Sequence, residues 1–165
     1  TEELNMLWLH ADDINIQIVL ILCYTGMRPT ELMTLKHSNV HLDERYMLGG
    51  IKTKAGKDRV IPIAQKIFPF IKRLYEQNND YLLTYENKKV EYDTFRRKLF
   101  APAMKLVELK HYPHDGRHTC ATLLDNAQVP DKIIKKILGH ATTDITEKVY
   151  THKTIRQLVD AINQI

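Results

Sequence analysis

Apolar residues recur at helical spacing through the first 35 residues of the chain. The pattern predicts a short helix over residues 1–10 and a second, strongly apolar helix in the run INIQIVLILCYTG. Asp12 or Asp13 can cap the start of the second helix, and Gly26 is a natural end to it. Pro29 suits the first turn of a third helix, PTELMTLKH, because a missing N–H costs nothing there.

From Val40 onward the pattern changes to short β-type segments. VHL, YMLGGI and RVIPI are rich in β-forming residues and are separated by DER and by the lysine-rich KTKAGK. We expect these segments to form a small antiparallel sheet with lysine-rich turns. A further short strand is predicted over residues 81–83.

Helical periodicity returns in the rest of the chain. Pro102 should cap or kink the helix that contains it, and Gly139 should end the helix that Pro130 opens. The predicted segments are helices over residues 65–77, 91–109, 114–126, 130–138 and 153–165, with a short helix or turn over residues 143–150. The sequence therefore predicts a mainly α fold with one small antiparallel β-sheet (α+β).

Composition sets the size and the setting. A chain of 165 residues, 44% of them hydrophobic, is sized for one domain with its own core, so residues 1–165 are expected to be a single domain. The net charge of +4 is compatible with phosphate binding, but taken alone it favours an ordinary soluble surface. Cys23 and Cys120 lie in apolar helical contexts, which favours small buried side chains over a disulfide or a zinc site. No signal peptide or membrane-spanning run is recognisable, so a cytoplasmic location is expected.

Arg28 lies in the break between two predicted helices, with Glu31 three residues further on. If a helix starts here, the carboxylate shares a face with the guanidinium and can hold it in one pose, with its fork left free for a phosphate. The simpler alternative is a surface ion pair, which is preferred for an isolated RPTE.

The segment HDGRH brings His114, Arg117 and His118 to one helix face, at positions i, i+3 and i+4. Two histidines at this spacing can be metal ligands, but the arginine between them disfavours a metal ion and the glutamate of an HExxH motif is missing. We therefore expect no metal site. His114 and Arg117 are interpreted as two groups that face one phosphate, and His118 as a packed core residue.

His140 and Tyr150 follow in the run LGHATTDITEKVYTH. An imidazole directly after a helix end can donate to a phosphate oxygen or move a proton, or it can simply satisfy the last carbonyls of the helix. An unperturbed tyrosine has a pKa of about 10 and is a poor nucleophile until nearby cations stabilise its phenolate. Taken alone, Tyr150 would be interpreted as one more surface tyrosine.

Basic residues crowd the predicted turn KTKAGKDR. A lysine on a hairpin can reach into a DNA groove and protonate a leaving oxygen, and Lys54 is the candidate, with a solvated turn lysine as the alternative. Lys52, Lys57 and Arg59 are assigned to DNA phosphate contacts, or to solubilising charge.

Four segments, in this order, resemble the catalytic boxes of the tyrosine recombinases, the family of phage and conjugative-transposon integrases. They are TGMRPTEL, KTKAGKDRVIPI, HDGRHTCATLL and LGHATTDITEKVYTH, and the pattern covers nearly the whole chain. The resemblance implies the tyrosine recombinase catalytic-domain fold, with Glu31 as a supporting acid and Lys52 as the alternative to Lys54. The six catalytic residues that it implies are Arg28, Lys54, His114, Arg117, His140 and Tyr150. Two departures from the family pattern, Pro29 and Gly116, touch no catalytic side chain.

The resemblance also implies a mechanism and partners. Tyr150 would attack a DNA phosphate and form a 3′-phosphotyrosyl link, which a 5′-hydroxyl of a partner strand then attacks, with no metal or other cofactor. The expected role is integration or excision of a mobile element, in a bacterial or phage-encoded protein. Double-stranded DNA is the expected partner, and the full-length protein is expected to act on it as a homotetramer. The family's N-terminal core-binding and arm-binding domains have no counterpart here, so we expect an excised, monomeric catalytic domain.

Three other functions stay open at this point. A type IB topoisomerase shares the chemistry but relaxes supercoils without a partner duplex. A non-catalytic DNA-binding module would keep the fold, although a decayed site should have lost a member of the set. A metal-dependent nuclease would be inhibited by EDTA. The final helix, residues 153–165, can dock on a neighbouring protomer or pack on its own domain.

Overall fold

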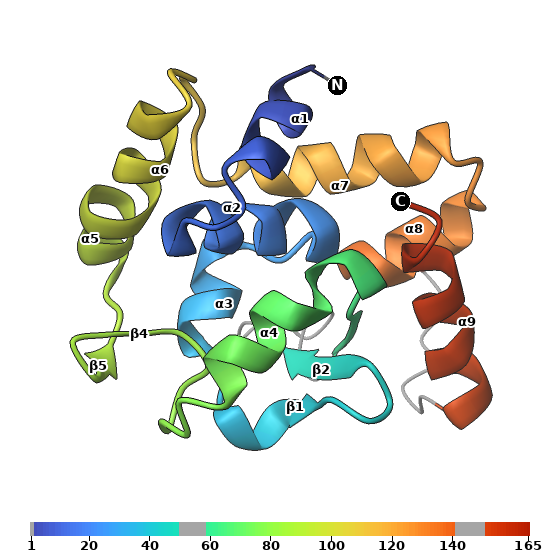
Figure 1. Cartoon of the computed structure of the whole chain (residues 1–165). Coiled ribbons are helices and arrows are strands. Elements are labelled where there is room, and N and C mark those ends of the chain that lie inside the picture. Colours follow the sequence, from blue (N-terminus) through green and yellow to red (C-terminus); the bar gives the residue numbers. More distant parts are fainter. Residues whose placement is uncertain (1, 50–58, 141–150) are drawn as a thin grey trace.

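The computed structural model describes residues 2–49, 59–140 and 151–165, where helices dominate and two small antiparallel sheets complete the fold (Figure 1). This confirms the predicted mainly α class with a small sheet. The helices are α1 (Glu2–Leu9), α2 (Ile14–Thr25), α3 (Pro29–Thr34), α4 (Phe68–Tyr75), α5 (Tyr92–Thr94), α6 (Ala101–Leu106), α7 (Asp115–Asn126), α8 (Asp131–Leu138) and α9 (His152–Ile162). The strands are β1 (Val40–His41), β2 (Tyr46–Gly49), β3 (Arg59–Pro62), β4 (Thr84–Tyr85) and β5 (Lys88–Lys89).

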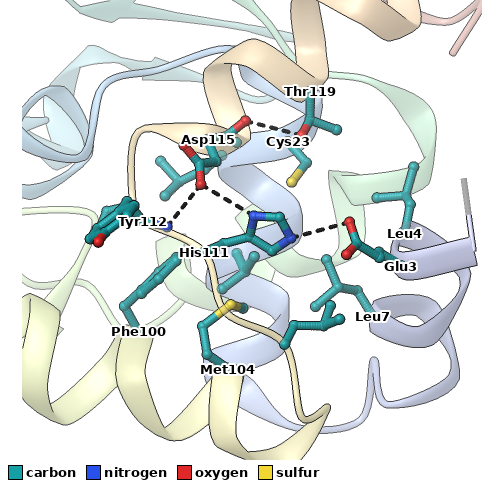
Figure 2. Close-up of a pocket in the computed structure, with 15 residues that line it drawn as sticks. Glu3, Leu4, Leu7, Cys23, Phe100, Met104, His111, Tyr112, Asp115 and Thr119 are labelled. Atoms are coloured by element: carbon teal, nitrogen blue, oxygen red, sulfur yellow. Dashed lines mark hydrogen bonds and ion pairs between the residues drawn. The ribbon is translucent and has the colours of Figure 1, made fainter.

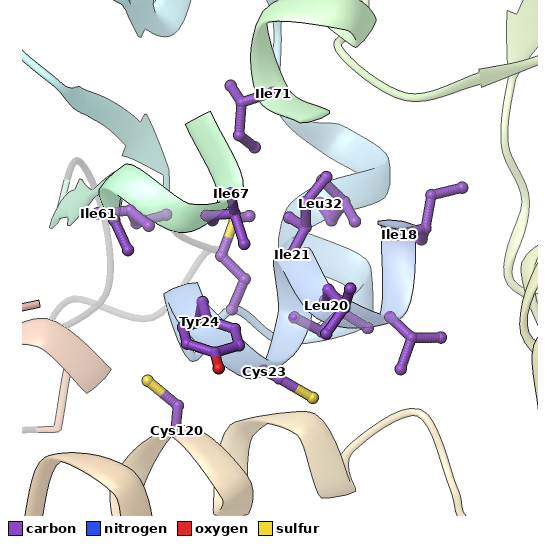
Figure 3. Close-up of a cluster of buried hydrophobic side chains, with 14 of the residues drawn as sticks. Ile18, Leu20, Ile21, Cys23, Tyr24, Leu32, Ile61, Ile67, Ile71 and Cys120 are labelled. Atoms are coloured by element: carbon purple, nitrogen blue, oxygen red, sulfur yellow. The ribbon is translucent and has the colours of Figure 1, made fainter. Parts of the chain in front are cut away.

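Helix α2 is the centre of the core, and its residues from Ile16 to Thr25 are all buried. A helix that is apolar on every side is typical of one surrounded by other elements. Side chains from α3, α4, β3 and α7 gather around it (Figure 3). Its ends were predictable: the Asp13 side chain accepts the N–H of Asn15 at 2.8 Å, and Gly26 closes the helix with a left-handed φ of 63°.

The main sheet has the order β1-β2-β3, with both neighbouring pairs antiparallel, as predicted. Met47 of β2 lies opposite Val40 on one side and Ile61 on the other. All four residues of β3 are buried, because α8 and α9 pack against this strand. The strand predicted over residues 81–83 is wrong: Tyr81 forms only an isolated bridge to Lys36, and β4 pairs with β5 just after it.

The helix predicted over residues 91–109 is interrupted, as Pro102 indicated. Between α5 and α6 lies one π-helical segment, η3 (Phe95–Phe100), where the N–H of Ala101 bonds to the carbonyl of Arg96 five residues back. Pro102 then occupies the first turn of α6, where the backbone N–H that proline lacks is not required for helical hydrogen bonding. The wider turn thus lets the chain accept proline without a break.

Helix α9 packs on its own domain, which is one of the two alternatives considered for the final helix. Its buried side chains are Ile155, Leu158, Ala161 and Ile162, and it contacts β3 and α8. The side-chain oxygen of Asn163, at its C-terminal end, accepts the backbone N–H of Gln65 at 2.7 Å.

Both cysteines are free and buried, as the sequence indicated. Burial raises the pKa of Cys23 and of Cys120 to about 12, so each thiol stays protonated. None of the helices in the described ranges has the length and apolar character needed to cross a lipid bilayer.

Candidate active site

Arg28 occupies the break between α2 and α3, and Glu31 fixes the backbone there. The Glu31 carboxylate is buried, and its Oε2 accepts the N–H of Arg28 at 2.7 Å. The contact between the Arg28 guanidinium and Glu31 Oε1 is long, at 3.9 Å, and the Arg28 side chain is 37% exposed. Glu31 therefore supports the main chain of Arg28 and leaves most of the guanidinium available to a ligand.

The close packing of α7 on α2 places Arg117 in the site. A Cβ atom at Gly116 would lie 2.9 Å from Leu22 Cβ and 3.3 Å from the backbone nitrogen of Cys23, so only glycine allows this approach without a shift. The next residue, Arg117, is 7% exposed and donates from Nη1 to the carbonyl oxygen of Gly26 at 2.8 Å. The departure from the family pattern at Gly116 thus has a structural reason.

Within the described ranges, the other side of the Arg117 guanidinium has no hydrogen-bond partner. Its Nη2 atom is buried and makes no hydrogen bond in the described structure. Burial lowers the pKa of Arg117 to about 10, and the positive charges of Arg28 and Arg59 contribute to this lowering. A buried cationic donor without an acceptor is unfavourable, so this position is suited to an anion.

His140 lies beside the same cations. It follows Gly139, the left-handed cap of α8, and its N–H bonds to the carbonyl of Lys135 at 3.0 Å. Partial burial lowers the pKa of His140, and so do the charges of Arg117, Arg28, Lys135 and Arg59. The structure therefore brings His140, Arg28 and Arg117 into one electrostatic neighbourhood, as the sequence predicted.

The two histidines of HDGRH differ from the sequence interpretation. His114 is exposed at the start of α7, and its ring makes no hydrogen bond to the arginines within the described ranges, so its role stays a prediction. The prediction that His118 is a packed core residue is wrong, because His118 is exposed. The face of α7 that packs against α2 carries Gly116, Cys120 and Leu124. His118 lies on a different face of the helix.

The assignment of Arg59 to DNA contacts is also wrong, since its side chain is 2% exposed. It forms an ion pair with Glu31, from Nη2 to Oε2 at 3.0 Å, and donates to the backbone carbonyl of Ile137. The continuous apolar run RVIPI was a signal of burial on both faces of the strand. The partner, 28 residues away, had no local signal.

The remaining predicted site residues lie outside the described residues. These are Lys52, Lys54, Lys57 and Tyr150. Within the described ranges, no three His, Cys, Asp or Glu side chains are grouped as a metal site requires.

A separate apolar pocket lies between α1, α2, α6 and α7 (Figure 2). At its rim His111 joins two helices, with Nε2 3.1 Å from Glu3 of α1 and Nδ1 3.2 Å from Asp115 of α7. Leu7 and Met104 are among its apolar walls. The predicted catalytic residues that the structure describes, Arg28, His114, Arg117 and His140, do not line this pocket, so it is distinct from the arginine site.

Fold and site together define a helical domain whose candidate site contains a cluster of arginines next to a histidine. The chain matches the phage integrase family over residues 3–156 and belongs to that family. This confirms the resemblance to tyrosine recombinases and integrases.

Named relatives support the assignment. Tyrosine recombinase XerA of Pyrococcus horikoshii is 34% identical over 164 residues, which cover 93% of this chain and 56% of that protein. A tyrosine recombinase of Agathobacter rectalis is 31% identical over 154 residues, covering 88% of this chain and 49% of that one. The chain therefore spans about half the length of the curated relatives it matches.

Solved structures share the fold. The crystal structure of XerA recombinase superposes with a TM-score of 0.70 at 28% identity, over 96% of this chain and 62% of that one. The Tn1549 transposon integrase in complex with circular intermediate DNA gives a TM-score of 0.69 at 21% identity, over 94% of this chain and 61% of that one.

Proposed function

We propose that this chain is the catalytic domain of a site-specific recombinase, which breaks and rejoins double-stranded DNA. The observation that carries the proposal is the Nη2 of Arg117, a buried donor beside Arg28 and His140 that has no acceptor among the residues that the structure describes. A DNA phosphate would supply the missing acceptor. The Tn1549 transposon integrase, which shares the fold, was solved in complex with DNA.

In the proposed reaction, the hydroxyl oxygen of Tyr150 attacks the scissile phosphorus. A bond forms between this oxygen and phosphorus while the bond from phosphorus to the 5′-oxygen breaks, which leaves a 3′-phosphotyrosyl link. Lys54 donates a proton to the departing 5′-oxygen. Arg28 and Arg117 stabilise the charge on the non-bridging oxygens, the effect that usually dominates such catalysis. His140 and His114 bind the phosphate, and a neutral imidazole of this pair accepts the proton that the Tyr150 hydroxyl loses.

Rejoining reverses these steps with a different 5′-hydroxyl. Because the phosphotyrosyl link retains the energy of the original phosphodiester, the exchange needs no nucleotide cofactor. We further propose that the full-length protein acts as a homotetramer on DNA in the cytoplasm, and that Lys52 and Lys57 contact DNA phosphates.

The test uses a trapping pool, defined as duplexes of randomised sequence with a nick next to the scissile phosphate. The short released strand diffuses away, so a covalent protein–DNA adduct accumulates and is seen on a denaturing gel. The parent chain should form the adduct, and Tyr150→Phe should not, while its DNA affinity changes little. Tyr112→Phe is the matched control, because Tyr112 is 78% exposed and lines the separate apolar pocket.

An adduct formed by Tyr150→Phe would disprove the choice of nucleophile. Plasmid relaxation without exchange between two duplexes would instead identify a topoisomerase. Loss of activity in EDTA would favour a metal-dependent nuclease.

A further inference from the structure

Arg59 is one of the most deeply buried large side chains of the described structure. Its fork meets one carboxylate with two hydrogen bonds, from Nε to Glu31 Oε1 and from Nη2 to Glu31 Oε2, each 3.0 Å long. Its third nitrogen, Nη1, donates to the backbone carbonyl of Ile137. Every nitrogen of this guanidinium therefore has a partner inside the protein.

Stability alone does not explain a buried ion pair of this kind. Removing two charges from water costs about as much as their attraction returns, and well-packed apolar residues often serve the fold as well. The ion pair instead fixes the orientation of the groups that it joins, because a planar guanidinium forms its hydrogen bonds at defined angles.

The groups that Arg59 bonds belong to separate parts of the arginine site. Glu31 also accepts the N–H of Arg28 at 2.7 Å, so one carboxylate carries both contacts. Ile137 lies three residues before His140, in the last turn of α8. The cap residue Gly139 is packed so tightly on the Arg59 side chain that a Cβ atom there would collide with it.

Arg59 also begins β3, directly after the segment that carries Lys54. One side chain of β3 thus connects the start of α3 with the end of α8. Arg28 directly precedes α3, and His140 follows the cap of α8.

We propose that Arg59 is a positioning residue for strand cleavage, which sets Arg28 through Glu31 and His140 through the end of α8 without touching DNA. The catalytic part of this inference rests on the proposed function. Its structural part, that Arg59 holds His140 in place, stands without it.

The critical variant is the double substitution Arg59→Met with Glu31→Gln. The new glutamine amide keeps an oxygen that can accept the N–H of Arg28, and no unpaired charge is left buried. The double variant should therefore melt at a higher temperature than Arg59→Met alone, because the single variant leaves the buried Glu31 carboxylate without its ion-pair partner. Arg73→Met is the matched control, since Arg73 is an exposed arginine whose contact to Gln17 is 3.4 Å long.

Two measurements on the folded double variant test the inference. In NMR spectra of the imidazole nitrogens, the His140 signals should shift and broaden, while those of His37, which bonds to the Tyr75 carbonyl, stay in place. Adduct formation with the trapping pool should fall by about 100-fold, the effect of displacing a catalytic group by roughly 1 Å. DNA affinity should stay within a few-fold of the parent.

His140 signals that coincide with those of the parent would overturn the inference, whether or not the parent cleaves DNA. So would cleavage within about threefold of the parent. If the His140 signals move but the parent chain itself forms no adduct, the proposed function fails while the positioning of His140 by Arg59 is supported.

Discussion

Nη1 of Arg117 donates a 2.8 Å hydrogen bond to the carbonyl oxygen of Gly26, 91 residues earlier in the chain. This bond joins the first turn of α7 to the turn that precedes Arg28. It also orients the guanidinium, so that one nitrogen is engaged by the protein and Nη2 remains for a ligand.

The different roles of the two guanidinium nitrogens predict the effect of Arg117→Lys. A lysine ammonium lacks the fork that reaches the Gly26 carbonyl and a phosphate oxygen together, so adduct formation should fall about 100- to 1,000-fold. The trapping pool measures it. His118→Gln is the control, because His118 is exposed on the same helix and should retain activity. Near-normal cleavage by Arg117→Lys would remove Arg117 from the site.

Gly26 should tolerate no side chain. Its φ is +63°, and an added Cβ would lie 2.5 Å from Leu138 Cδ2 and 3.2 Å from Cys120 Sγ. Gly26→Ala should lower the free energy of unfolding by about 1–3 kcal/mol, measured by urea denaturation. In the matched control, Gly49→Ala, the new methyl group meets the terminal methyl of Ile61 and φ is ordinary, so the loss should be smaller. Equal losses would show that the left-handed turn is unimportant.

His140 should take up protons when DNA binds. In the free protein, burial and the charges of Arg117 and Arg28 hold the pKa of His140 below its ordinary value of 6.5. A phosphate bound among these cations offsets their charge, so the pKa should rise on binding. By linkage, affinity should be higher at low pH and fall as the pH rises through the range between the two values.

NMR titration of the His140 ring, with and without a DNA duplex, checks this prediction. The Tyr150→Phe variant prevents cleavage during the measurement, and His37 provides an internal reference. A His140 pKa that is unchanged or lower with DNA would place the phosphate elsewhere.

Lys54 and Lys52 can be separated by changing the leaving group. A general acid typically contributes about 100- to 10,000-fold, so the alanine variant of the true acid should cleave ordinary DNA very slowly. Replacing the bridging 5′-oxygen with sulfur gives a thiolate that leaves without a proton. Cleavage of this substrate by Lys54→Ala should recover to near the parent rate, with Lys52→Ala active on both substrates. The reverse pattern would assign the role to Lys52.

Much of the fold followed from local signals. Asp13, Gly26 and Gly139 each mark a helix end by a side chain or backbone preference that acts within a few residues, and each marks it in the structure. Pro102 likewise changes the hydrogen bonding of its helix, to a π-helical segment, for a purely local reason. Such signals need no knowledge of tertiary contacts.

Site contacts between distant segments were less accessible. The predictions for His118 and Arg59 were wrong because their environments are set by α2 and by Glu31, which are remote in sequence. The cluster of Arg28, Arg117 and His140 could be foreseen only through the family resemblance. No periodicity indicates that residues so far apart in sequence lie together in the fold.

The pKa of Arg117, lowered to about 10 by burial and by two neighbouring arginines, has a consequence for the evolution of this protein. The domain spends part of its folding free energy on holding like charges together. Under the proposed function, selection for heat resistance alone would favour loss of one of these cations, at the expense of phosphate binding. Under that function, the close approach of like charges at this site reflects selection for phosphate binding.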